Sequence, residues 1–284
     1  MLTLIKKHKA FGGHVEVYTH PSSSTQTPMN FSLYRPSQSE QEKRPAVFFL
    51  SGLTCNEENF ITKAGALETA ERLGLFLICP DTSPRGTELP EEHTSWDFGS
   101  GAGFYVKATE PGWKDHYNMY DYISKELPSL IGQNFPIQEN NWSLFGHSMG
   151  GLGALMISLR NPTLFKSCSA FSPLTSPTRC PWGIKALTHY LGTDKLSWEQ
   201  YDPCLLLLKA TQIIPTLIDQ GTDDEFLEEQ LKTSLLEELI AHHRPIKRSV
   251  TLRWQKGYDH SFYFVSSFIK DHLEFHAQYL LNRD

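Results

Sequence analysis

The sequence has no long hydrophobic run and no strong excess of charge of either sign. Its longest apolar runs have the length of a strand, far below the roughly 20 residues of a membrane-spanning helix. Lys and Arg number 26 against 32 Asp and Glu, a formal net charge of -6, so electrostatics gives no reason to expect nucleic acid or an anionic membrane as a partner. Residues 1–7 do not resemble a secretory signal, and we expect a cytoplasmic enzyme.

Cysteine is also sparse, and no metal motif is present. The five cysteines are odd in number, scattered and without paired spacing, which predicts free thiols and no metal site. His272 and His276 lie four residues apart, but the glutamate between them is not where the common helical zinc motifs place it. For these two histidines we therefore expect a solvated helix face.

The most informative motif is Gly146-His147-Ser148-Met149-Gly150. The apolar run at 142–145 predicts a strand, and the Leu and Met residues within 151–160 have helical spacing. A sharp turn between a strand and a helix is typical of a nucleophile elbow, where glycines leave room for the neighbouring backbone. Ser148 is therefore the predicted nucleophile. We expect His147 to be structural, with its side chain directed away from the serine hydroxyl.

A serine nucleophile needs a histidine base and a carboxylate that holds the imidazole, and both follow later in the chain. A predicted strand at 249–254 leads into a loop that contains His260, the predicted base. A predicted strand at 213–218 leads into a loop with three aspartates. Asp219 could instead bind turn amides, and one of Asp223 and Asp224 could cap the following helix, so residue chemistry alone leaves all three open.

Two backbone amides are predicted to form an oxyanion hole. Met149 follows the nucleophile directly, and Leu53 follows Gly52 in the loop after the strand-like run at 46–50. Cys55 ends the same loop. It has no dedicated base, so we expect it to lie beside the site and not to act as a nucleophile.

Bulky aromatic residues are candidates for the wall of the acyl pocket. They are Trp96 and Phe104, in a glycine-rich segment at 95–105, and Trp182. Phe104 and its neighbour Tyr105 could equally be anchors of the core. Large side chains near the nucleophile would exclude long acyl chains, and no long apolar insertion is available to form the lid of a lipase.

The order of apolar patterns predicts a mostly parallel central sheet with helices on both faces, in a single domain over residues 1–284. Together with the elbow and the order of Ser, Asp and His along the chain, this predicts an α/β-hydrolase fold. Two alternating runs at 14–19 and 30–34 predict an antiparallel start, with a loop or hairpin connection at 20–29. The other predicted strands are 47–50, 75–79, 142–145, 167–171, 213–218 and 249–254, and the predicted helices are 59–73, 118–130, 151–160, 225–241 and 262–281.

Several segments, in order along the chain, resemble those of the S-formylglutathione hydrolases of the esterase D family. They are Ser51-Gly52-Leu53-Thr54-Cys55, Pro80-Asp81-Thr82-Ser83-Pro84-Arg85-Gly86, Ser95-Trp96-Asp97-Phe98-Gly99, Gly101-Ala102-Gly103-Phe104-Tyr105-Val106, the elbow, Cys180-Pro181-Trp182-Gly183 and Gly257-Tyr258-Asp259-His260-Ser261. The resemblance implies hydrolysis of the thioester S-formylglutathione to glutathione and formate, the last step of glutathione-dependent formaldehyde detoxification.

The resemblance also implies further properties of the site. The family pattern of Gly, two variable residues, Asp, one variable residue and Phe-Leu falls on Gly221, Asp224, Phe226 and Leu227, which makes Asp224 the implied acid. It further implies sensitivity to thiol reagents through Cys55 and a homodimer. No metal or organic cofactor is expected, because the triad chemistry is complete without one.

Two other functions are weighed against this one. A general carboxylesterase would use the same triad, so we expect some activity on short activated esters. A binding protein that retains the elbow but not the chemistry would require the loss of a triad member, and none is missing.

Overall fold

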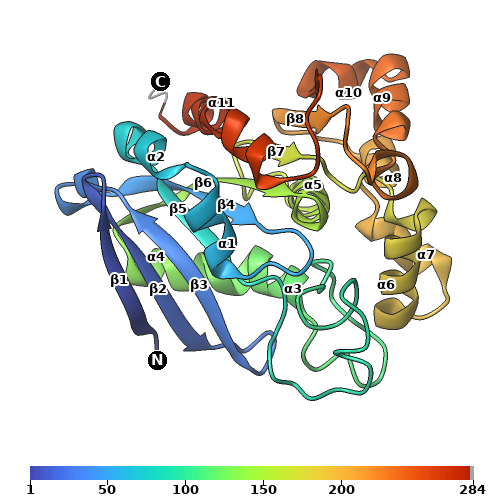
Figure 1. Ribbon diagram of the computed structural model, residues 1–284, viewed down its shortest axis with the longest axis horizontal. Coiled ribbons are helices and arrows are strands. Elements are labelled where there is room, and N and C mark those ends of the chain that lie inside the picture. Colours follow the sequence, from blue (N-terminus) through green and yellow to red (C-terminus); the bar gives the residue numbers. More distant parts are fainter. Residues whose placement is uncertain (282–284) are drawn as a thin grey trace.

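One mixed sheet organises the computed structural model, which describes residues 1–281 (Figure 1). Within this range nine strands follow the order β1-β2-β3-β5-β4-β6-β7-β8-β9. The strands β1 to β3 pair in antiparallel fashion and β3 is antiparallel to β5, while all pairs from β5 to β9 are parallel. The strands are β1 (Thr3–Ala10), β2 (Gly13–Pro21), β3 (Pro28–Arg35), β4 (Arg44–Leu50), β5 (Phe76–Pro80), β6 (Ile137–His147), β7 (Cys168–Phe171), β8 (Thr216–Gly221) and β9 (Val250–Gln255).

Helices cover both faces of the parallel part, which is why strands such as β5, β7 and β8 are buried along their whole length. In Figure 1 the helices α6 and α8 to α10 gather at the end of the molecule opposite β1. The α-helices are α1 (Glu57–Lys63), α2 (Leu67–Leu73), α3 (Met119–Asp121), α4 (Leu127–Asn134), α5 (Met149–Arg160), α6 (Pro181–Leu191), α7 (Lys195–Trp198), α8 (Pro203–Lys209), α9 (Thr233–His242), α10 (Arg244–Ser249) and α11 (Phe262–Leu280).

The alternation of side chains along the strands divides the core into two clusters, one on each face of the sheet. Phe48 of β4 belongs to the cluster that includes residues of α4 and α5, whereas its neighbour Phe49 belongs to the cluster that includes residues of α1, α2 and α11. The carboxyl ends of the parallel strands are thereby fixed side by side. The loops after β4, β6, β8 and β9 leave the sheet at this edge.

The predicted fold class is confirmed, and the eight predicted strands are all present. The connection at 20–29 is a hairpin between β2 and β3, as expected. The strand β1 was not predicted. The predicted helix at 225–241 is interrupted, because Lys232 adopts a left-handed backbone conformation between a π-helical turn, Leu227–Leu231, and α9. In residues 1–281 no helix is long and apolar enough to span a bilayer.

The prediction of a solvated face for His272 and His276 was wrong. Both side chains are completely buried, because this face of α11 packs against the sheet. The imidazole of His276 makes hydrogen bonds with the hydroxyls of Ser167 and Ser169, each at 2.8 Å, and His272 bonds the Ser169 hydroxyl as well. Their spacing of four residues therefore reflects a polar contact between helix and sheet.

Candidate active site

Ser148 occupies a strained turn between β6 and α5. Its backbone has φ 59 and ψ -121, a conformation that a residue with a side chain adopts only under constraint. The constraint comes from close packing of the backbone. A Cβ atom on Gly150 would lie 1.9 Å from the carbonyl oxygen of Leu50, and one on Gly146 would lie 2.2 Å from the carbonyl oxygen of Gly150. The predicted strand, turn and helix are thus all present. Glycine is required at both positions because a side chain would collide with the backbone.

His260 and Asp224 meet between the loops that follow β9 and β8. The Nδ1 atom of His260 lies 2.6 Å from Oδ2 of Asp224, and Oδ1 of Asp224 accepts a hydrogen bond from the Phe226 amide at 3.0 Å. An ionised carboxylate only accepts hydrogen bonds, so Nδ1 carries the proton and Nε2 is left as the acceptor. Burial alone would raise the pKa of Asp224. The hydrogen bond and charge of His260 outweigh it and hold that pKa below the usual range.

The other two aspartates have different partners. Both carboxylate oxygens of Asp219 accept hydrogen bonds from Arg253 at 2.6 Å, and Oδ2 lies 3.4 Å from Nε2 of His272. Burial would raise the pKa of Asp219, but its bonds with His272 and Arg253 lower it. Asp223 accepts a hydrogen bond from the Thr222 hydroxyl at the surface. The structure therefore pairs His260 with Asp224, the acid that the family resemblance implies.

Ser148 and His260 line one pocket, which has a volume of about 220 Å³. Its lining is Gly52, Leu53, Cys55, Trp96, His147, Ser148, Trp182, Phe226, His260, Ser261 and Phe262. Of the predicted pocket residues, Cys55, Trp96 and Trp182 thus lie at the site. The lining also includes Phe226, Ser261 and Phe262, which residue chemistry did not single out. Phe226 had one usable signal, its place in the family pattern two residues after the acid.

The predicted oxyanion loop runs beside the serine. A Cβ atom on Gly52 would lie 3.1 Å from Cβ of Ser148, so the backbone of this loop passes directly against the nucleophile candidate. The amides of Thr54 and Cys55 donate to the carbonyls of Gly101 and Gly52, whereas the Leu53 amide has no acceptor within residues 1–281. Met149 is the first residue of α5, and amides in the first turn of a helix have no partner inside the helix. Both amides are therefore free to face a ligand.

An aromatic wall connects the catalytic histidine candidate with solvent. The rings of Phe226 and His260 are nearly perpendicular, with 5.0 Å between their centroids. The centroids of Trp182 and Phe226 are 4.8 Å apart, and those of Trp96 and Trp182 are 5.4 Å apart. Trp96 is 56% exposed, while Trp182 is buried. The pocket is therefore largely apolar near the reacting groups. Its opening to solvent lies at the exposed Trp96.

Known proteins match nearly the whole length of this chain. A family model described as putative esterase matches residues 22–275. The S-formylglutathione hydrolase of Rattus norvegicus is 49% identical over 98% of this chain and 99% of the rat protein. The chain belongs to the S-formylglutathione hydrolase family. The predicted resemblance and the prediction of a hydrolase are thereby confirmed.

Solved structures of S-formylglutathione hydrolases are also similar to this chain. The structure of an S-formylglutathione hydrolase from Agrobacterium tumefaciens is 46% identical, covers 98% of this chain and 99% of its own, and superposes with a TM-score of 0.92. An S-formylglutathione hydrolase from Staphylococcus aureus is only 18% identical but covers 98% of this chain and 99% of its own, with a TM-score of 0.71. At that identity the likeness supports the fold alone.

Two details of the site differ from the sequence predictions. Phe104 does not wall the pocket. Its side chain is 1% exposed and belongs to the core, as does that of Tyr105, whose hydroxyl donates to the Ser51 carbonyl. His147 was expected to be directed away from the reacting group, yet it lines the pocket and its ring lies 4.6 Å from that of His260. Burial lowers the pKa of His147 to about 3, so its imidazole is neutral at ordinary pH.

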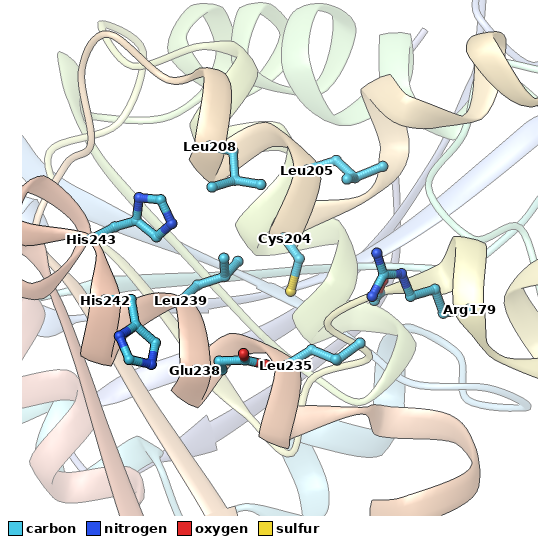
Figure 2. Close-up of a pocket in the computed structure, with 10 residues that line it drawn as sticks. Arg179, Cys204, Leu205, Leu208, Leu235, Glu238, Leu239, His242 and His243 are labelled. Atoms are coloured by element: carbon cyan, nitrogen blue, oxygen red, sulfur yellow. The ribbon is translucent and has the colours of Figure 1, made fainter.

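The cysteines are all free thiols, as the sequence predicted. Cys55 is partly exposed in the pocket, and burial raises the pKa of its thiol, which disfavours the reactive thiolate. A second pocket of about 220 Å³ surrounds Cys204 between α8 and α9 (Figure 2). Burial raises the pKa of Cys204 to about 12, so this thiol stays protonated, and no residue of the predicted triad lines that pocket.

Proposed function

We propose that this chain hydrolyses S-formylglutathione to glutathione and formate, with Ser148 as nucleophile, His260 as general base and Asp224 as the acid that holds the imidazole. The observation that carries the proposal is the 2.6 Å contact between His260 and Asp224 at a pocket that Ser148 also lines. Membership of the S-formylglutathione hydrolase family, with relatives such as the rat protein at 49% identity, supports the choice of substrate.

In the first half of the reaction, Oγ of Ser148 attacks the formyl carbon while its proton passes to Nε2 of His260. Nδ1 of that imidazole donates to Asp224, whose charge stabilises the imidazolium that forms. The amides of Leu53 and Met149 stabilise the oxyanion, and one such donor contributes on the order of 3 kcal/mol to the transition state. The carbon–sulfur bond then breaks, the sulfur takes the proton from His260, and glutathione leaves a formyl ester on Ser148.

In the second half, water attacks the formyl ester. His260 takes a proton from the water, the ester bond breaks, and this proton returns to Oγ of Ser148. The product leaves as formic acid, which releases its own proton to solvent and becomes formate. No metal or organic cofactor takes part in either half. The proposal therefore needs only the pocket residues, one water molecule and the thioester.

The pocket fits a small acyl group on a large leaving group. The formyl group needs little space beside Ser148, which agrees with a volume of about 220 Å³ and with the bulky Trp182 and Phe226 next to His260. The glutathione part of the substrate would extend toward the open end, where Trp96 is exposed. A long acyl chain has no comparable space, so we expect side activity only on short esters such as acetates.

The test is a comparison of kcat/KM for S-formylglutathione and for a short aryl acetate, with Ser148→Ala as the inactive reference. We expect the thioester to be preferred by a wide margin, and both activities to disappear in the variant. Equal values, or a preference for the aryl ester, would instead support a general short-chain esterase.

By resemblance to its family, we also propose that the protein is a cytoplasmic homodimer that completes glutathione-dependent formaldehyde detoxification. Light scattering of the purified protein tests the dimer. Loss of formaldehyde tolerance in cells that lack the protein tests the physiological role, with restoration by the wild-type chain but not by Ser148→Ala.

A further inference from the structure

Gln220 is a buried amide beside Asp224 that the proposed mechanism does not use. It lies on β8 directly after Asp219, and the alternation of side chains along a strand sends the two to opposite faces. Asp219 reaches Arg253 and α11, whereas Gln220 reaches Thr233 at the start of α9 and Asp224 in the following loop. Gln220 has no exposed surface and does not line the pocket around Ser148.

The side chain of Gln220 makes four hydrogen bonds. Its Nε2 atom has three acceptors, Oδ2 of Asp224 at 3.2 Å, the carbonyl of Gly221 at 3.1 Å and the hydroxyl of Ser172 at 3.2 Å, so its two hydrogens are shared among them. The hydroxyl of Thr233 donates to its Oε1 atom at 2.8 Å. A carboxylate and a backbone carbonyl can only accept hydrogen bonds, so the amide nitrogen must face them, and this chemistry fixes the orientation of the amide.

We propose that Gln220 is a positioning residue that holds the carboxylate of Asp224 in the orientation in which Oδ2 faces Nδ1 of His260. This inference rests on the proposed triad. Oδ2 accepts from both His260 and Gln220, and Oδ1 accepts from the Phe226 amide, so donors on both oxygens fix the plane of the carboxylate. The Ser172 hydroxyl, which contacts Gln220, also acts on Asp224 and lowers its pKa. The hydroxyl of Thr233 in turn holds the amide of Gln220. Ser172, the residue that follows β7, contacts the same amide from the end of the neighbouring strand.

Loss of the Gln220 donor would affect turnover and not binding. Because Gln220 does not line the pocket, the substrate touches neither the side chain nor its partners, and KM should stay nearly constant. The proton transfers through His260 depend on the orientation of Asp224, so kcat should fall by about tenfold, the factor expected for a hydrogen bond to a charged group.

The lost donor would also change the dependence on pH. A donor to the ionised carboxylate favours the charged form, so its removal raises the pKa of Asp224. Without that donor the carboxylate also interacts more strongly with the imidazolium of His260, so the acidic limb of kcat moves to higher pH. The other titratable groups that act on Asp224 are His260 and Asp259 in the loop after β9, and His147 at the end of β6. A substitution at Gln220 leaves all three of these residues in the chain.

The experiment compares Gln220→Met, which keeps the length of the side chain but has no donor, with Gln220→Glu, which keeps the contact with Thr233 and places a second carboxyl group against Asp224. For Gln220→Met we expect kcat about tenfold lower, KM within twofold of wild type and an acidic limb at higher pH. For Gln220→Glu we expect a larger shift of that limb, because the two carboxyl groups repel each other when ionised.

Asp219→Asn is the matched control, since it alters a buried side chain one position away on the same strand. It should lower the melting temperature but leave kcat and the acidic limb unchanged. A Gln220→Met enzyme with wild-type kcat and pH profile would overturn the inference, and so would a loss of activity that follows only the folded fraction. If Asp224→Asn itself kept full activity, the proposed triad would fail, which distinguishes the two failures.

Discussion

The imidazole of His147 packs against the imidazole of His260, with 4.6 Å between the ring centroids and an angle of 39° between the rings. Only one of the two can be charged near neutral pH, because burial holds the pKa of His147 at about 3. The neutral ring of His147 therefore packs against His260 without placing a second positive charge beside it. Gly52 leaves the space that this arrangement needs, since a Cβ atom there would approach both His147 and Ser148.

This contact predicts different outcomes for two substitutions at His147. His147→Phe keeps an aromatic ring against His260, so kcat should stay within a few-fold of wild type. His147→Ala leaves a cavity and should cost about 2 kcal/mol of unfolding free energy, together with a clear loss of kcat. Urea unfolding and steady-state kinetics check both variants. Equal kcat in the alanine and phenylalanine variants would show that the ring does not support His260.

Buried neutral histidines predict a loss of stability in acid. Burial lowers the pKa of His147 to about 3 and that of His276 well below its usual value, whereas both titrate near 6.5 in the unfolded chain. Between these values the unfolded state binds more protons, so the stabilisation is complete above about pH 6.5 and is lost as the pH falls through that window. Each such histidine adds a slope of up to about 1.4 kcal/mol per pH unit.

The free energy of unfolding, measured in urea from pH 7 to pH 4, checks this dependence. In the His147→Phe variant the unfolding free energy should change less steeply with pH, by up to about 1.4 kcal/mol per pH unit, because one proton fewer is taken up on unfolding. A slope identical to that of wild type would mean that His147 is protonated in the folded enzyme.

The glycines of the elbow predict a sharp contrast with a glycine elsewhere. Gly150→Ala places a methyl group against the carbonyl oxygen of Leu50, where backbone meets backbone, and should cost at least about 4 kcal/mol or prevent folding. Gly132→Ala in α4 is the control, since the nearest atom, on Trp142, is 4.0 Å from the new Cβ. It should be neutral or stabilise by up to about 1 kcal/mol. Equal melting temperatures of the two variants would contradict this explanation.

The three aspartates at the end of β8 and in the loop after it should differ in function. Asp224→Asn should lower kcat by about ten-thousandfold, as expected when the acid of such a triad becomes an amide. Asp223→Asn should stay close to wild type, because its partner is the exposed Thr222 hydroxyl. Asp219→Asn should cost about 3 kcal/mol of stability through its pair with Arg253, with kcat retained. A collapse of kcat in Asp223→Asn equal to that in Asp224→Asn would leave the assignment of the acid unsupported.

The sequence predicts most of the fold and the members of the site, because both depend on local patterns. Buried strands appear as continuous apolar runs, and the elbow appears as two glycines around a serine. The choice among the aspartates needed either the family pattern or the structure. All three lie within or just after β8, where the pattern of the sequence does not separate them. The side chain of Asp219 pairs with Arg253, whereas the path of the loop brings Asp224 to His260.

Tertiary packing explains the predictions that failed. Phe104 follows glycines in a segment that looks like a loop, but that segment folds into the core. His272 and His276 have the spacing of a polar helix face, yet on the buried side serines of the sheet bond both nitrogens of His276 and Nδ1 of His272. The place of Gln220 beside Asp224 could not be predicted, because it depends on the side chain of Thr233 and on the backbone of the loop between them.

The most direct test of the central claim is reaction of the native enzyme with a fluorophosphonate, followed by mass spectrometry of its peptides. The account predicts one covalent adduct on Ser148, formed much more slowly in His260→Ala and in Asp224→Asn and absent in Ser148→Ala. An adduct on another residue, or a labelling rate of Ser148 that does not change when His260 is removed, would contradict it.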